Sequence, residues 1–132
     1  MVNLILYNYS IELYNFFMKR LFKEMPWFTK EWKNLGFDDD ALSGLQNIIL
    51  DDPKAGNLIQ GTGGVRKLRF AFVGKGKSGS CRIIYADYAS YEIVYLIAAY
   101  KKSDKETLTK NERNEIKKLL QKIKEQEREA KK

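Results

Sequence analysis

The clearest pattern along the chain is an alternation of apolar and polar residues in its middle third. In residues 67–72, Leu, Phe and Phe alternate with Lys, Arg and Ala, which predicts a strand with one apolar and one cationic face. Residues 80–88 predict a second strand, in which Arg82 points away from the apolar face. Residues 91–100 are apolar at both parities, as in a strand covered on both faces. A three-stranded meander is therefore expected, with a short hairpin turn at residues 89–90.

Two helices are predicted before the meander. Residues 27–35 predict a helix, with Pro26 near its start and Gly36 just past its end. The three aspartates at 38–40 suit the positive N-terminal end of a second helix, which the Asp-Pro pair at 52–53 ends. A glycine-rich loop then leads into the first strand of the meander.

A third helix is predicted after the meander. Thr109 and Glu112 have the N-cap and N3 spacing of a capping box. The apolar stripe of this helix consists of Ile116, Leu119, Leu120 and Ile123. Beyond Glu125 the pattern is all charge, so we expect the tail to fray.

The N-terminal residues have two interpretations. Residues 20–24 predict a short edge strand, which Pro26 stops. Residues 1–17 are rich in aromatic and aliphatic side chains and carry one charge. They form a short amphipathic helix in one interpretation. In the other they are an upstream extension of a chain whose natural start is Met18, and they are then dispensable.

The predicted fold class is α+β. The element order is strand, two helices, three-stranded meander and helix. The simplest arrangement of these elements is a small antiparallel sheet with helices packed on one face, and its N-terminal edge strand makes the sheet mixed. We expect an extension at residues 1–17, one domain at residues 18–125 and a charged tail at residues 126–132.

Charge narrows the range of partners. The 132 residues carry 24 Lys and Arg against 17 Asp and Glu, a net charge of +7. Residues 66–105 alone hold nine basic and three acidic side chains, whereas residues 1–65 hold six and eight. This concentration favours a polyanion, nucleic acid before membrane, as the partner.

Composition also excludes several chemistries. The chain has no His, which removes the usual general base near pH 7, the His-containing triads and most zinc sites. The single cysteine fits a reducing cytoplasm, and no apolar run is long enough to span a bilayer. We therefore expect a cytoplasmic protein with no metal, no cofactor and no membrane partner.

Three other motifs favour plain structural roles. Residues 74–79 match a dinucleotide-binding string and the end of a P-loop, but a strand and not a helix follows, so a basic hairpin is favoured. The aspartates at 38–40 are adjacent and suit a helix cap better than one cation. Cys81 shares the apolar face of its strand and is interpreted as a small buried hydrophobe.

The basic residues of the meander form the most informative group. Lys67 and Arg69 share one strand face, and Arg82 is placed to join them from the next strand. Lys101, Lys102 and Lys105 follow at the exit of the third strand. One interpretation is a solvated basic face. The other is an anion-binding surface, because cations at this spacing repel each other unless a polyanion offsets them.

These motifs resemble a known family. The runs PWFTK (26–30), GTGGVRKLRFA (61–71), GKGKSGSCRIIY (74–85) and YKKSDKETLT (100–109) are similar to the HigB-type branch of the RelE/ParE toxin superfamily. The resemblance covers roughly residues 18–125 and implies a RelE-like fold. It implies the toxin of a type II toxin–antitoxin pair, which cleaves mRNA in the ribosomal A site. The implied partners are the ribosome, mRNA, a helix-turn-helix antitoxin and, through the antitoxin, operator DNA.

The resemblance also implies site residues. The positions that match the family are Lys67, Arg69, Arg82, Lys102 and Lys105, and of these we expect Lys67, Arg69, Arg82 and Lys102 to be catalytic. We expect RNA to be bound by Arg66, Lys75, Lys77, Lys101 and Lys105. Residues 1–17 have no counterpart in the family, and Cys81 stands where an aromatic residue or Gly is common.

Cleavage without His is possible if the substrate supplies the nucleophile. An RNA 2′-hydroxyl can attack the adjacent phosphate while Arg69 and Arg82 stabilise the growing charge and Lys67 or Lys102 exchanges a proton. Two other functions stay open. One is a ParE-like toxin that inhibits a protein target such as gyrase, and the other is an RNA-binding module without catalysis.

Overall fold

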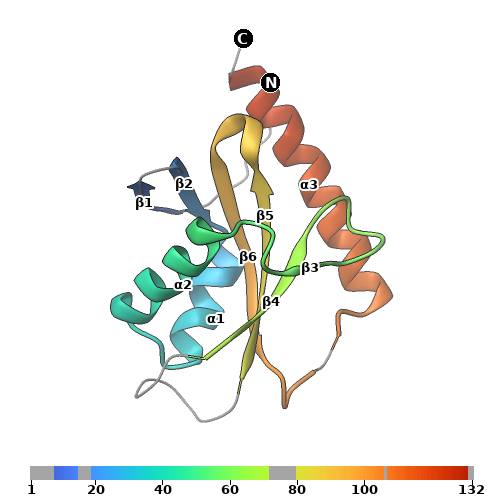
Figure 1. Cartoon of the computed structure of the whole chain (residues 1–132). Coiled ribbons are helices and arrows are strands. Elements are labelled where there is room, and N and C mark those ends of the chain that lie inside the picture. The colour runs from blue at the N-terminus through green and yellow to red at the C-terminus, as the bar shows by residue number, and fades with distance from the viewer. Residues whose placement is uncertain (1–7, 15–18, 72–79, 106, 131–132) are drawn as a thin grey trace.

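The fold is a mixed sheet with helices on both faces (Figure 1). The computed structural model describes residues 8–14, 19–71, 80–105 and 107–130. Within them the elements are β1 (Asn8–Tyr14), β2 (Lys19–Glu24), α1 (Pro26–Asn34), α2 (Asp39–Asp51), β3 (Asn57–Leu58), β4 (Arg66–Phe70), β5 (Cys81–Tyr88), a 3-10 turn η1 (Ala89–Tyr91), β6 (Ile93–Lys101) and α3 (Lys110–Ala130). The sheet order is β1-β2-β6-β5-β4-β3, with β2 and β6 parallel and the other pairs antiparallel. The predicted α+β class is confirmed.

Strand β6 lies at the centre of the sheet and is buried on both faces. All seven residues from Ile93 to Ala99 are buried, as the unbroken apolar pattern predicts. Its pairing with β5 skips Ile97, because Ala98 pairs with Ile84 and Leu96 with Tyr85. This extra residue is a bulge that shifts the alternation of side chains toward the end of β6.

The helices cover opposite faces of the sheet. Helices α1 and α2 pack on the face of Phe70, Cys81 and Ile83, whereas α3 packs on the face of Ile84 and Tyr95. The expectation that all helices lie on one face is therefore wrong. The physical reason lies in β6, whose two apolar faces both need a helix to exclude water.

The predicted starts of the three helices are confirmed. Pro26 is the first residue of α1, and the Asp38 carboxylate accepts a 3.0 Å hydrogen bond from the Ala41 N–H at the start of α2. At α3, the Thr109 N–H donates to Glu112 Oε1 at 2.9 Å and the Glu112 N–H donates to Thr109 Oγ1 at 3.1 Å. Each such cap stabilises its helix by about 1 kcal/mol.

The turns of the meander differ from the prediction in detail. The predicted short hairpin turn before β6 is a 3-10 turn, and Glu92 after it adopts a left-handed conformation with φ 59°. The loop before β4 contains the short strand β3, which was not predicted. Phe72, the last residue of the predicted alternation, lies outside the described residues.

The N-terminal segment is a strand where it is described. Strand β1 pairs antiparallel with β2, so the expected helix is wrong over residues 8–14, and residues 1–7 and 15–18 lie outside the described part. Strand β2 consequently lies inside the sheet and not at its edge. The unpaired backbone groups that an edge strand presents explain this pairing. The Arg20 guanidinium of β2 also donates a 2.7 Å hydrogen bond to the carboxylate of Asp87, near the C-terminal end of β5.

The C-terminal charged segment is ordered by buried partners. Helix α3 continues to Ala130, so the expectation that the chain frays beyond Glu125 is wrong. Glu127 is only 7% exposed and accepts a 3.0 Å bond from the Lys23 ammonium of β2. The Tyr95 hydroxyl donates to the same carboxylate oxygen. The sequence shows a run of charges here, but one of them belongs to the interior.

We predict that Glu127→Ala lowers the free energy of unfolding by about 3–5 kcal/mol, because it leaves the Lys23 charge buried without this partner. Replacing the pair together, with Lys23→Met and Glu127→Leu, should restore stability close to the parent. Urea unfolding followed by circular dichroism measures both. A loss below about 1 kcal/mol for Glu127→Ala would contradict the buried pair.

Candidate functional site

Three cations lie together on the α3 face of the sheet, as the sequence predicts for the first two strands of the meander, which are β4 and β5. Arg69 of β4 stands directly opposite Arg82 of β5, and Lys67 of β4 stands opposite Ile84. Opposite residues of antiparallel strands share a face, so Lys67, Arg69 and Arg82 lie on the side of Ile84 and α3. We call these three residues the cationic face.

The members of the cationic face differ in exposure. Arg69 is exposed and Lys67 is half-buried, whereas Arg82 is only 5% exposed. Arg82 lies between Arg69 on one neighbouring strand and Tyr100 on the other, and its Nη1 donates to Ser80 Oγ at 3.3 Å. It therefore points away from Cys81 as predicted, but its side chain is packed and not open to solvent.

The three lysines near the end of β6 do not form one group. Lys101 pairs with Cys81, which places it on the α1 and α2 face, opposite the cationic face. Lys102 is exposed, and its N–H donates to the Ser80 carbonyl at 3.2 Å, next to Arg82. The prediction that all the meander cations share one surface is therefore wrong for Lys101.

Lys105 is paired with an acid. Its ammonium forms an ion pair with Glu112 and lies 5.4 Å from the centre of the Tyr100 ring. Burial alone would raise the pKa of Glu112, but the hydrogen bonds from Lys105 and the Thr109 N–H outweigh it and lower that pKa below its ordinary value. Glu112 thus caps α3 and also offsets the Lys105 charge, so Lys105 contributes less to an anion site than the sequence predicts.

Arg66 has a structural role on the opposite face. It pairs with Tyr85, and its Nη1 donates to the Gly56 carbonyl at 2.7 Å. The Tyr85 hydroxyl accepts from the Gly56 N–H at 3.0 Å and donates to the Pro53 carbonyl at 2.8 Å. A Cβ at Gly56 would lie 2.9 Å from the Lys67 carbonyl oxygen, so this close approach requires glycine. Arg66 therefore fixes the loop before β3 and lies away from the cationic face.

Two predicted residues lie outside the described part of the chain. Lys75 and Lys77 belong to residues 72–79, so their RNA-binding role stays a prediction. The glycine pattern of residues 74–79 lies there too.

Cys81 behaves as a core residue. Its thiol donates to the Phe70 carbonyl at 3.3 Å, and burial raises its pKa to about 11. It therefore stays protonated at neutral pH and is a poor nucleophile. In the described ranges no group of three His, Cys, Asp or Glu side chains is placed to hold a metal ion, and no helix there has the length and apolarity to cross a membrane.

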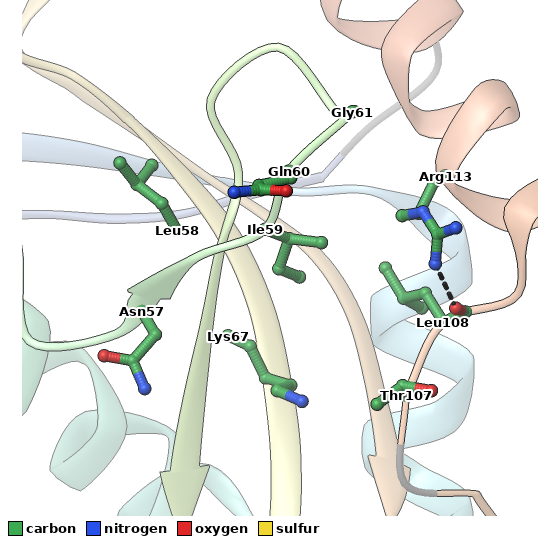
Figure 2. Close-up of a pocket in the computed structure, with 9 residues that line it drawn as sticks. All are labelled: Asn57, Leu58, Ile59, Gln60, Gly61, Lys67, Thr107, Leu108 and Arg113. Atoms are coloured by element: carbon green, nitrogen blue, oxygen red, sulfur yellow. Dashed lines mark hydrogen bonds between the residues drawn. The ribbon is translucent and has the colours of Figure 1, made fainter.

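A pocket of about 690 Å³ adjoins the cationic face (Figure 2). Residues 57–61 and Lys67 form one side, and residues 107–108 with Arg113 form the other. Sequence reasoning missed this pocket and also missed Tyr100, which lies opposite Arg82. Tyr100 begins a run that resembles the family motif, which was the available signal, whereas the pocket joins segments far apart in the chain.

Comparison with known proteins gives a family and a similar structure. A family model described as the RelE toxin of the RelE / RelB toxin–antitoxin system matches residues 19–131. The chain is also similar to a solved structure described as a mutant of the E. coli toxin RelE in the free state, with two arginines replaced by alanine. The two share 19% sequence identity over 64% of this chain and 85% of that chain, with a TM-score of 0.45.

We predict that Glu112→Gln lowers the free energy of unfolding at pH 7 by about 0.5 kcal/mol, because glutamine keeps the cap but loses the charge that pairs with Lys105. The pKa of Glu112 is lower when folded, so its contribution is present above pH 4.5 and is lost as the pH falls through the folded value. The difference from the parent should therefore shrink as the pH falls below 4.5 and through the lowered folded pKa of Glu112. The control is Glu115→Gln, an exposed partner of Lys118. Urea unfolding at several pH values measures this, and a difference that stays constant with pH would contradict it.

Proposed function

Since the chain belongs to the RelE toxin family, whose model matches residues 19–131, we propose that it is a ribosome-dependent endoribonuclease that cleaves mRNA and arrests translation. It acts in the cytoplasm and is neutralised by a helix-turn-helix antitoxin, through which it also reaches operator DNA. The HigB-type assignment within the superfamily rests on the motifs of the sequence.

The observation that carries the proposal is the direct opposition of Arg69 and Arg82, with Lys67 on the same face. Like charges directly opposite each other on neighbouring strands destabilise a sheet. A phosphate placed over the pair reverses this effect, because guanidinium groups bind phosphate oxygens through paired hydrogen bonds. The face is therefore suited to an anion that carries more charge in the transition state than in the ground state.

The reaction that fits this face uses the RNA as its own nucleophile. The 2′-oxygen attacks the adjacent phosphorus and forms the 2′,3′-cyclic phosphate, while the bond from phosphorus to the 5′-oxygen breaks. The 2′-hydroxyl loses its proton and the departing 5′-oxygen gains one, so the step balances without the consumption of water. Lys67 or Lys102 serves these proton transfers.

The two arginines have different places in this mechanism. Arg69 is exposed and is positioned to contact the phosphate oxygens of a bound strand. Arg82 is buried beside it, so its charge already lies out of water and in a fixed position. Fixed charges in a site that excludes water stabilise developing charge most effectively.

Dependence on the ribosome follows from the lack of a strong base. The chain has no His, and the three residues of the cationic face are two arginines and a lysine. Such a site stabilises charge but does little to align the 2′-oxygen with the bond that breaks. A second partner that aligns the strand lowers this part of the barrier. The ribosome can act as this partner because it holds mRNA in a defined conformation.

We predict that Arg69→Ala reduces mRNA cleavage about 100- to 1000-fold, because it removes a charge donor aimed at the phosphate. The fold should be unchanged, since Arg69 is exposed. Arg69→Lys should retain partial activity, because it keeps the charge and loses the fork. The matched control is Arg128→Ala, an exposed arginine near the end of α3.

Cleavage rates in a cell-free translation system, growth arrest on induction and circular dichroism measure the three variants. Folded Arg69→Ala protein that arrests growth as the parent does would show that the cationic face is not the active site.

A further inference from the structure

The pocket beside the cationic face has the composition of a binding site and not of a packing defect. It holds two amides, Asn57 and Gln60, and two cations, Lys67 and Arg113. Figure 2 shows Ile59 and Lys67 on one wall and Leu108 and Arg113 on the facing wall. Polar groups thus surround a partly apolar interior, an arrangement that holds a flat ring with polar edges.

The walls of this pocket are fixed by hydrogen bonds. The Ile59 N–H donates to the Val65 carbonyl at 3.0 Å, and the Thr62 hydroxyl donates to the Ile59 carbonyl at 2.6 Å. Thr62 is fully buried, and its hydroxyl also accepts from the Val65 N–H at 3.2 Å. These bonds close the loop between β3 and β4 on itself. The pocket is therefore formed before a ligand arrives, which lowers the cost of binding.

The facing wall is fixed as well. Arg113 Nη1 donates to the Leu108 carbonyl at 2.8 Å, which holds the guanidinium at the start of α3 (Figure 2). Leu108 is buried and provides an apolar surface beneath it. The guanidinium plane and the aliphatic side chains of Ile59 and Leu108 suit contact with the face of a base, and the amides suit its edge.

Lys67 connects the pocket to the cationic face. It lines the pocket and lies two residues before Arg69 on the same side of β4, roughly 7 Å along the strand. A nucleotide whose phosphate lies at Arg69 therefore has its neighbouring base within reach of the pocket.

We propose that this pocket receives one base of the RNA strand and thereby sets the sequence preference of cleavage. The inference rests on the proposed function, and Asn57 and Gln60 are the residues that read the base. A side-chain amide carries both a hydrogen-bond donor and an acceptor, so it distinguishes bases whose edges differ in the placement of donors and acceptors. A protein segment would be a different ligand, and the cations that adjoin the pocket favour a nucleic acid.

Mapping of RNA 5′ ends tests the assignment. Asn57→Ala and Gln60→Ala should lower the ratio of cleavage at the preferred base to cleavage at other bases, at one position beside the cut, by roughly 5- to 100-fold. Total cleavage should stay within a few-fold of the parent. The controls are Asn47→Ala on α2 and Gln121→Ala on α3, exposed amides that do not line the pocket. An unchanged preference in both amide variants would overturn the proposal. A general loss of cleavage with the preference retained would also overturn it.

A binding measurement separates this proposal from the proposed function. The side-chain amide signals of Asn57 and Gln60 are followed by NMR during titration with short single-stranded RNAs of each base composition. We expect these signals to shift with at least one base and those of Asn47 and Gln121 to stay. Shifts in a protein that cuts no mRNA would leave the pocket assignment standing and reject the nuclease. Signals that respond to no RNA would overturn the pocket assignment and point to a protein ligand.

Discussion

Strand β6 is buried on both faces, and this double burial determines where the other elements pack. Its apolar side chains need cover on each side, so α1 and α2 occupy one face and α3 the other. Parallel pairing to β2 and antiparallel pairing to β5 fix its two edges. The register of β5 then decides where Arg82 lies, and the register of β4 brings Arg69 opposite it. The cationic face is thus a consequence of how the central strand is held.

The same framework explains why the face can hold charge at a cost to stability. Apolar burial in two clusters provides the stabilisation. Like charges that stand directly opposite each other on neighbouring strands, as Arg69 and Arg82 do, repel. Functional sites commonly keep such unfavourable contacts, because the ligand removes them.

Local signals predicted much of the fold. The Asp38 cap, the Thr109 and Glu112 capping box and the two-sided burial of β6 each depend on residues close in sequence. The predictions that were wrong concern features that depend on residues distant in the sequence. Glu127 is ordered by Lys23, 104 positions earlier, and β1 is a strand because β2 offers it an edge.

The candidate site was predictable to a similar extent. Lys67, Arg69 and Arg82 share a face because strand alternation places them there. Lys101 was misplaced because its face follows from the register with Cys81, and Arg66 has the opposite parity to Lys67. The pocket joins residues 57–61 to residues 107–113, a contact that no local pattern contains.

Dependence on the ribosome is tested by a comparison of one mRNA in two states. Purified protein is added to naked mRNA and to the same mRNA under translation by ribosomes, and the RNA ends are sequenced. We expect cuts in phase with codons on the translated mRNA and little cutting of the naked RNA, because the proposed role of the cationic face is to stabilise charge and not to align the strand. Efficient cutting of naked mRNA, or intact transcripts in the presence of translating ribosomes, would contradict it.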